Sequence, residues 1–256
     1  MTEAALEIRG LGKSFGGVKA ISDVSLAVPQ GSLTAVIGPN GAGKTTLFNL
    51  VTNLYPADRG EVKFYGDSIL GIGPGKIAAR GLIRTFQTAR IFPGMTALEN
   101  ILAGSHLHIC RAPWQQMLWL PRAQREERAL AAKADALLDL VGLASYRDMA
   151  ATDLPMGGQK LLEVVRALMA GPRLLLLDEP AAGLNDAETA DLAELLRAVR
   201  DSGITVIVVE HNMSLVMGVA DQVIVLDAGA VVAAGTPREI QKDKRVIAAY
   251  VGAEEA

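Results

Sequence analysis

Three segments of the chain alternate apolar and polar side chains with a period of two, at residues 6–9, 24–28 and 61–66. This pattern is typical of strands that have one face in the core, because successive side chains of a strand point to opposite faces. The first two segments are separated by residues 13–18, a turn that carries Phe15. We expect these segments to form an antiparallel β-sheet.

Two later segments are apolar without alternation. Residues 174–177 are four leucines, and residues 204–209 consist mainly of Ile and Val. Continuous apolar runs are typical of strands that are buried on both faces of a parallel sheet. Residues 186–201 between them have a helical pattern, which predicts a βαβ unit with a right-handed crossover. Beyond them the pattern predicts a hairpin from residues 222–226 and 231–234, and then a short helix that ends at Tyr250 or Val251.

The middle of the chain has the spacing of a helix instead. The apolar positions are Leu130, Ala134, Leu137, Leu138 and Val141. Charged residues fall on the other faces of this segment, as in an amphipathic helix. The patterns together predict one α/β domain over residues 1–256, with a helical subdomain at about 96–170 inserted in its α/β core.

A glycine-rich stretch follows a β-prone run at residues 33–37 and precedes a helical run at residues 45–51. It has the pattern G-x-x-x-x-G-K-T, and its residues, with the one that follows, are Gly38, Pro39, Asn40, Gly41, Ala42, Gly43, Lys44, Thr45 and Thr46. Glycine adopts backbone conformations closed to other residues, so successive N–H groups can point at a phosphate. Lys44 can reach the β- and γ-phosphates, and the Thr45 hydroxyl can ligate magnesium. We therefore expect a phosphate-binding P-loop at a helix N-terminus.

Both long apolar strands end in acidic residues. Asp178 and Glu179 follow the leucines, and Glu210 and His211 follow the second run. Ligands of open parallel sheets bind at the carboxyl ends of the strands, where the P-loop also lies. Because Asp178 and Glu179 project differently, one can hold Mg²⁺ while the other orients a water molecule.

Composition excludes several classes of function. The net charge of −3 gives no basic surface for nucleic acid, so we expect no nucleic-acid partner. The single cysteine, Cys110, excludes an internal disulfide and fits a reducing compartment. We expect no secretory signal, and no apolar run approaches the length of a membrane span. Any role at a membrane is therefore expected to be peripheral.

These motifs, in this order, resemble those of the ATP-binding-cassette ATPases over essentially the whole chain. They are the P-loop, Gln87, a glycine-containing signature at residues 154–158, Asp178 with Glu179, and Glu210 with His211. The resemblance implies a P-loop NTPase fold, with a RecA-like parallel core, an N-terminal antiparallel β subdomain and the helical subdomain. It also implies ATP as the nucleotide and Mg²⁺ as the metal ion.

The resemblance also assigns roles to residues. Phe15 stacks on adenine, Glu179 is the general base, and His211 contacts the γ-phosphate. Gln87 senses the γ-phosphate and acts in catalysis, and it joins Thr45 and Asp178 as a magnesium ligand. Residues 182–186 resemble the loop that crosses to a second subunit.

The signature departs from the usual L-S-G-G-Q. Pro155 replaces the serine, so the hydroxyl that would contact the γ-phosphate is absent. Met156, Gly157 and Gly158 remain at this site, followed by a helix expected to start at about Gln159. Backbone N–H groups and the helix dipole can still favour a phosphate there.

Finer features resemble the ATPases of branched-chain amino-acid importers. They include the enlarged helical region at residues 114–143, residues 178–185 and 210–217, and the tail from Gly235 to Gly252. The resemblance implies a subunit on the cytoplasmic face of the bacterial cytoplasmic membrane, energising the uptake of small amino acids. Its partners would be a second ATPase subunit of a different sequence, two membrane permease subunits and, indirectly, a solute-binding protein.

Alternatives of other classes remain. Importers of urea or amides have similar ATPases, and some ATPases of this superfamily are soluble and do not transport. A P-loop GTPase would need an Asn-Lys-x-Asp motif, which the sequence lacks. Residues 91–94 lie just after Gln87, and they are expected either to meet a permease or to plug the core beneath the helical insertion.

Overall fold

The computed structural model describes residues 3–85, 91–105 and 121–251, and side-chain positions are described for residues 3–85, 91–105 and 125–250. Gln87, Cys110 and residues 114–119, which figure in the sequence predictions, lie outside the described residues. Within the described chain, no helix is both long enough and apolar enough to cross a bilayer.

The amino-terminal part forms a four-stranded antiparallel sheet in the order β2-β1-β4-β5. Its strands are β1 (Ala4–Phe15), β2 (Val18–Pro29), β4 (Arg59–Phe64) and β5 (Asp67–Ser68). The antiparallel sheet is confirmed, but β1 and β2 are longer than predicted. The pairing of β1 with β2 shifts register between Ile8 and Lys13, where Gly10 has a φ of +57°. Such bulges insert an extra residue and change which face the following side chains point to. A search for strict two-residue alternation therefore detects only part of each strand.

The second sheet has six strands in the order β10-β9-β3-β8-β7-β6. They are β3 (Leu33–Ile37), β6 (Leu82–Arg84), β7 (Leu174–Asp178), β8 (Thr205–Val209), β9 (Gln222–Asp227) and β10 (Ala230–Gly235). Strands β6, β7, β8, β3 and β9 run parallel, and β10 returns antiparallel to β9. The predicted parallel core and hairpin are confirmed, and β6, a strand of three residues, was not predicted.

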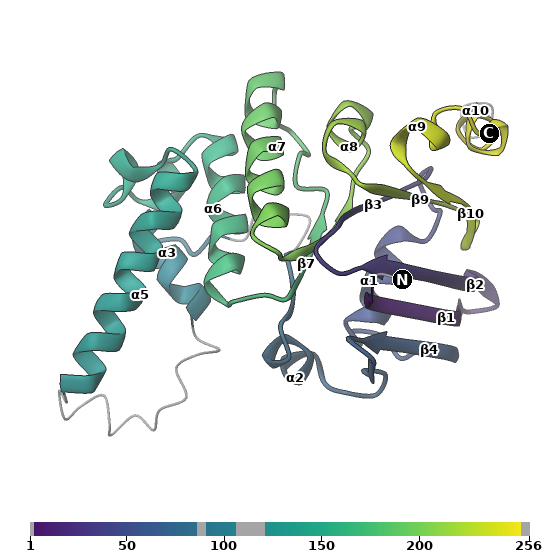
Figure 1. Ribbon diagram of the computed structural model, residues 1–256, viewed down its shortest axis with the longest axis horizontal. Helices are drawn as coiled ribbons and strands as arrows, with labels where there is room; N and C mark the ends of the chain where they lie inside the picture. Colours follow the sequence, from purple (N-terminus) through teal and green to yellow (C-terminus); the bar gives the residue numbers. More distant parts are fainter. Residues whose placement is uncertain (1–2, 86–90, 106–120, 252–256) are drawn as a thin grey trace.

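Helices cover this sheet and extend the molecule to one side. They are α1 (Lys44–Val51), α2 (Pro74–Ala79), α3 (Ala97–Ala103), α5 (Pro121–Leu140), α6 (Met156–Met169), α7 (Asp186–Asp201), α8 (Met213–Val219), α9 (Pro237–Ile240) and α10 (Lys244–Val251), with 3₁₀ turns η2 (Ala144–Tyr146) and η3 (Ala151–Asp153). Figure 1 shows α3, α5 and α6 gathered at one end of the molecule and β1, β2 and β4 at the other. The fold is that of a P-loop NTPase. Its division into a core and an inserted helical subdomain stays a prediction.

The parallel sheet is buried on both faces, as its continuous apolar strands predict. Along β7, Leu175 and Leu177 pack into the cluster shared with the helices α5, α6, α7 and α8. Leu174 and Leu176 pack into a second cluster with α1 and the antiparallel sheet. The parallel sheet therefore lies between two hydrophobic clusters.

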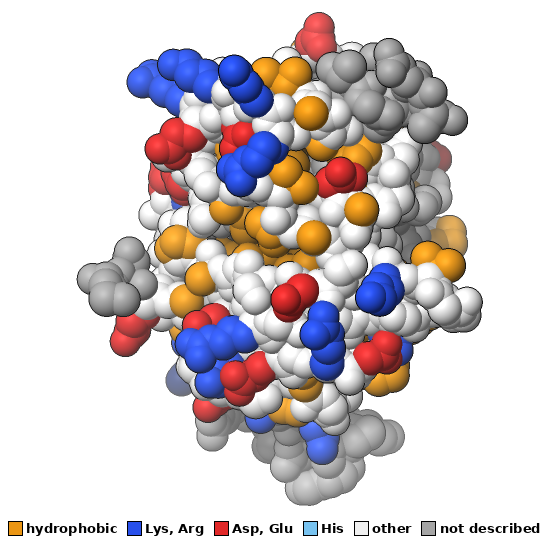
Figure 2. Space-filling model, turned by 90° about the vertical axis from the view of Figure 1, so that its right-hand side faces the viewer, with side chains coloured by type: hydrophobic (Ala, Val, Ile, Leu, Met, Phe, Trp, Pro, Cys, Tyr) orange, Lys and Arg blue, Asp and Glu red, His pale blue; other side chains and the backbone are white. Residues whose placement is uncertain are grey.

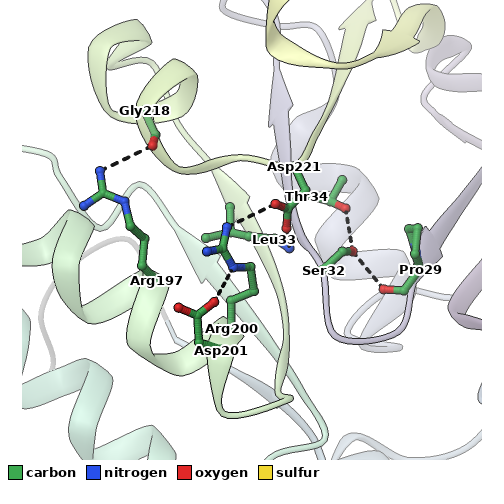
Figure 3. Close-up of polar contacts among 9 residues, drawn as sticks. All are labelled: Pro29, Ser32, Leu33, Thr34, Arg197, Arg200, Asp201, Gly218 and Asp221. Carbon is green, nitrogen blue, oxygen red and sulfur yellow. Dashed lines mark hydrogen bonds and ion pairs between the residues drawn. The ribbon is translucent and has the colours of Figure 1, made fainter.

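Polar contacts fix the amino-terminal edge of the parallel sheet (Figure 3). The Asp221 carboxylate accepts the Leu33 N–H at 2.8 Å and pairs with the Arg200 guanidinium at 3.0 Å. Nearby, Arg197 of α7 donates to the Gly218 carbonyl at the end of α8. These contacts tie β3, β9, α7 and α8 together at the edge of the sheet opposite the P-loop.

The surface at the β1–β2 end has mixed charge. Figure 2 shows Lys and Arg side chains interspersed with Asp and Glu, with hydrophobic side chains across the middle of the face. Among the described residues, both signs of charge are therefore mixed on this face.

Candidate nucleotide-binding site

The predicted phosphate-binding and acidic residues meet at one edge of the parallel sheet. Strand β8 pairs with both β3 and β7, and all three run in the same direction. The P-loop follows β3, Asp178 ends β7 with Glu179 next, and Glu210 and His211 follow β8. Topology thus places the P-loop, both acidic strand ends and His211 at neighbouring positions, where open parallel sheets bind ligands.

Two P-loop glycines are required by close backbone contacts. At Gly38 the φ is +151°, and a Cβ atom there would lie 2.0 Å from the Leu226 carbonyl oxygen. At Gly43 the φ is +99°, and a Cβ atom would lie 2.7 Å from the Ala20 carbonyl oxygen. Any larger residue at either position would push the loop away from β9 or β2. Gly43 is also the N-cap of α1 and has no side chain. It therefore supplies no side-chain acceptor to the first N–H groups of α1.

Lys44 lies folded into the loop. Its ammonium group donates to the carbonyl oxygens of Gly38 at 2.7 Å and Pro39 at 3.0 Å. Burial lowers the pKa of Lys44, and the charges of Glu179 and Asp178 oppose this shift. A buried cation beside two carboxylates and a row of amides is suited to a polyanionic ligand.

Asp178 fits the role of a magnesium ligand. Its side chain is 3 % exposed, and its Oδ1 is buried without a hydrogen-bond partner among the described residues. Oxygen atoms of carboxylates and hydroxyls are the ligands that Mg²⁺ prefers. Thr45, at the start of α1, is exposed at the same edge. The oxygen chemistry of this pair therefore suits Mg²⁺, while Gln87 lies outside the described residues.

Arg84 holds the other oxygen of Asp178, and sequence reasoning gave it no role. Its Nη2 lies 2.8 Å from Asp178 Oδ2, and its Nη1 lies 2.6 Å from Asn49 Oδ1 in α1. The guanidinium also lies over the Phe48 ring, at 5.6 Å. Arg84 thus links β6, β7 and α1 beneath the site. An isolated arginine at the end of a three-residue strand carries no signal that would predict this contact.

Glu179 and His211 contact each other across β7 and β8. Glu179 Oε1 and His211 Nε2 are 3.0 Å apart, and both side chains are partly exposed. Glu179 has a φ of +50°, in the left-handed region that non-glycine residues rarely occupy. Backbone strain of this kind clusters at functional sites. The pair can therefore act together on a water molecule or a phosphate at the mouth of the site.

Glu210 is a buried positioning residue that the sequence prediction left without a role. Its carboxylate accepts the Ala181 N–H at 2.7 Å, the His211 N–H at 3.0 Å and the Asn212 N–H at 3.3 Å. Burial raises the pKa of Glu210, and these three hydrogen bonds oppose the shift. Glu210 therefore fixes the loop that carries His211 against the loop that follows Glu179.

Phe15 stands at the exposed end of β1. Its side chain is 42 % exposed, and its ring meets Tyr55 edge-on at 5.6 Å. Tyr55, which follows α1 and was not predicted, is also exposed. An exposed aromatic pair near the P-loop helix offers a flat apolar surface to a base.

The signature lies at the start of α6, which begins at Met156 with Pro155 as its N-cap. The prediction that this helix starts at about Gln159 was therefore wrong by three residues. Paired glycines favour a loop from sequence alone, but tertiary packing overrides that preference here. A Cβ atom on Gly157 would lie 2.6 Å from Glu188 Oε1 of α7, so a larger residue there would displace the Glu188 side chain from its present position. The contacts described for Met156 and Gly157 are with residues 183–188 of their own chain.

Comparison with known proteins identifies the family. Residues 21–182 match the model of the family described as "ABC transporter". Residues 230–256 match a second model, "Branched-chain amino acid ATP-binding cassette transporter". The first match includes the P-loop, the signature and the acidic end of β7.

Curated relatives match along nearly the whole chain. The chain is 41 % identical to the high-affinity branched-chain amino acid transport ATP-binding protein BraF of Pseudomonas aeruginosa, covering 98 % of this chain and 99 % of that protein. It is 37 % identical, with the same coverage, to the corresponding LivG protein of Escherichia coli K12. The crystal structure of the ADP conformation of MJ1267, an ATP-binding cassette of an ABC transporter, superposes with a TM-score of 0.85 at 32 % identity, covering 98 % of this chain and 100 % of that one. This chain therefore belongs to the ABC transporter family of ATP-binding proteins.

Proposed function

We propose that this chain is the ATP-hydrolysing subunit of an importer for branched-chain or related small amino acids. The observation that carries the proposal is the convergence of Lys44, Asp178, Glu179 and His211 at one sheet edge beside the P-loop. The names of the relatives support the transport role and the class of solute. The proposal includes a place on the cytoplasmic face of the cell membrane.

The P-loop residues hold the phosphates of ATP in this proposal. Backbone N–H groups between Gly38 and Thr46, except at Pro39, which has none, would surround the β- and γ-phosphates, and Lys44 would exchange its carbonyl contacts for phosphate oxygens. Phe15 stacks on the adenine. Mg²⁺, held by Thr45, Asp178 and Gln87, would neutralise charge on the phosphates when bound.

Glu179 is the general base of the proposed reaction. Its carboxylate takes a proton from a water molecule as the water oxygen forms a bond to the γ-phosphorus. The bond from that phosphorus to the ADP oxygen breaks, which gives ADP and inorganic phosphate. His211, 3.0 Å from Glu179 Oε1, orients the carboxylate and contacts the γ-phosphate, and Glu210 fixes the backbone of His211.

The signature serves a second ATP-binding chain. The first turn of α6, at Met156, Gly157 and Gly158, presents N–H groups at a helix N-terminus, which suits a γ-phosphate held by the other subunit. Residues 182–186 cross to that subunit. We propose that the second chain has a different sequence in the cell.

A coupling surface to the permease lies beside the segment that contains Gln87. Phe92, Met95 and Met149 are 46 %, 40 % and 40 % exposed. The segments that carry them lie side by side. The Met95 carbonyl accepts the Ala151 N–H, and the Met149 carbonyl accepts the Ala97 N–H. Ile91 packs against the core instead. Residues 91–95 thus combine the two predicted roles, with Ile91 as a core contact and Phe92 exposed to a permease.

Purification of the membrane complex that contains this chain tests the proposal. We expect two permease subunits and a second ATPase to copurify. In vesicles that contain the complex, leucine uptake should require ATP and should stop in the Lys44→Ala variant. Uptake of urea or an amide in place of leucine would favour the alternative importer, and purification without any membrane subunit would favour a soluble ATPase.

A further inference from the structure

The Glu188 carboxylate accepts a hydrogen bond from a backbone N–H group of the signature. The proposed function requires the same N–H group to bind a phosphate. Its Oε1 accepts the Gly157 N–H at 3.2 Å, and its Oε2 accepts the Asn185 N–H at 3.0 Å. Gly157 is the second residue of α6, so its N–H has no partner within the helix. One carboxylate therefore joins the start of the signature helix to the start of α7.

The sequence of the signature explains why a residue from another helix is needed here. Helices usually have a Ser, Thr, Asp or Asn at the N-cap, whose side-chain oxygen accepts an N–H of the first turn. Pro155 is the N-cap of α6 and has no such oxygen. Glu188 supplies the missing acceptor from α7. It does so in addition to its own capping box with Asn185.

Because the Gly157 N–H is one of the groups proposed to receive the γ-phosphate of the other subunit's ATP, two anions compete for one donor. We infer that Glu188 occupies the signature in the separated chain and must leave Gly157 before an ATP-bound partner can close on it. This inference rests on the proposed function. Glu188 then sets the nucleotide concentration at which two subunits associate.

The surroundings of Glu188 allow this exchange. A hollow of about 560 Å³ lies beside the carboxylate, between the end of α5, the start of α6 and α7. The side chain can rotate into this hollow without displacing the core. Asp191 and Glu194 also line it, and their like charges favour the return of Glu188 to Gly157 when the phosphate is absent.

Glu188→Gln tests the inference. Glutamine keeps the capping box, since Glu and Gln serve equally at this position, and it removes only the charge. In the full chain with Glu179→Gln, which retains ATP, we measure dimerisation against ATP concentration by sedimentation. Removal of a like charge about 4 Å from the phosphate is worth roughly fivefold per site in water. The homodimer that the purified chain forms in this experiment has two such sites, so its dissociation constant should fall about 25-fold.

The matched control is Glu194→Gln. It removes the same charge from the same helix and the same hollow, but about 9 Å further along the axis, where salt screens it. The effect of Glu188→Gln on the dissociation constant of the dimer should become smaller as the salt concentration is raised, because salt screens the repulsion between the two anions. Dimerisation that is unchanged or weaker in Glu188→Gln, or changed equally by Glu194→Gln, would overturn the inference.

A second measurement examines the contact without ATP or a dimer. Because the Gly157 N–H has no helical partner, Glu188→Ala should speed its hydrogen exchange several-fold, and Glu194→Ala should not. Equal exchange at Gly157 in both variants would overturn the inference. Failure of the Glu179→Gln parent to bind ATP would instead contradict the proposed function.

Discussion

At the scale of single residues, the site depends on charges that are buried beside one another. Lys44, Asp178, Arg84 and Glu210 are all largely buried at the carboxyl edge of the sheet. Each of the four has a polar partner, and Asp178 also keeps one buried oxygen without a hydrogen bond among the described residues. Such groups respond strongly to substitution, because the loss of one leaves its neighbour uncompensated.

Lys44→Ala should abolish productive ATP binding. The lysine places a positive charge inside the loop, where its ammonium group donates to the carbonyl oxygens of Gly38 and Pro39. Equilibrium binding of ATP to the purified variant measures this. Lys63→Ala, which removes a partly exposed lysine paired with Glu61 on β4, should bind ATP as the parent does. Near-normal ATP affinity and turnover in Lys44→Ala would show that the P-loop is assigned wrongly.

Glu210→Gln should change how stability depends on pH. Burial raises the pKa of Glu210 above the ordinary 4.5, so the folded chain keeps this proton at a pH where the unfolded chain has lost it. The contribution of Glu210 to the free energy of unfolding is therefore full at acid pH and declines as the pH rises through the folded pKa. Glutamine does not titrate, so the stability of the variant relative to the parent should increase with pH above 4.5. Urea denaturation at a series of pH values measures it, and a relative stability that falls with pH would contradict it.

At the scale of elements, strong local patterns predicted most of the fold. The strands at 33–37 and 174–178 and the helix at 186–201 agree with β3, β7 and α7 because each has an uninterrupted apolar run or a regular helical stripe. Bulges at Gly10 and Gly12 hid the length of β1, and β6 is too short to give a period. The first turn of α6 is contacted by Glu188, which is 31 residues away, and no local pattern could reveal that contact.

The same reasoning separates predicted from unpredicted site residues. The P-loop, Asp178, Glu179 and His211 occur in motifs whose spacing reflects their chemistry. Arg84 and Glu188 act through long-range contacts, and Glu210 acts on backbone N–H groups. Such partners emerge only when the fold brings distant segments together.

Pro155→Ser should strengthen closure at the signature. A serine at the N-cap of α6 provides a hydroxyl that can donate to a γ-phosphate of the other subunit. A charge-assisted bond of this kind is worth roughly 1.5–3 kcal/mol, or at least about tenfold in affinity. Dimerisation against ATP concentration in the Glu179→Gln background measures it. Pro155→Ala, which loses the ring without gaining a hydroxyl, is the control, and equal affinities in the two variants would refute the prediction.

At the scale of the whole molecule, the two ends of Figure 1 have different tasks. The α/β part provides the P-loop and the acidic strand ends, while α3, α5 and α6 carry the signature and the segment next to the exposed Phe92. Along the sequence, β6 ends at Arg84, and Gln87 and then Phe92 follow it. A change at the γ-phosphate can therefore reach the proposed permease surface through a short stretch of chain.

Crosslinking tests that surface in the assembled complex. In a chain with Cys110→Ser, single cysteines at Phe92, Met95 and Met149 should crosslink to a permease subunit. Ile247→Cys, in α10, is an equally exposed apolar control and should not. If none of the three positions reacts in an active complex, Phe92 and its neighbours are not the coupling surface.

The central claim is that this chain hydrolyses ATP with Glu179 as the base. Glu179→Gln keeps the shape of the side chain and removes its basicity. We measure ATP binding and phosphate release for the parent and the variant in the same preparation of the complex. The variant should bind ATP as well as the parent does, while phosphate release falls about 10²–10⁴-fold, the usual worth of a general base. Phosphate release at the parental rate from the Glu179→Gln complex would contradict the account.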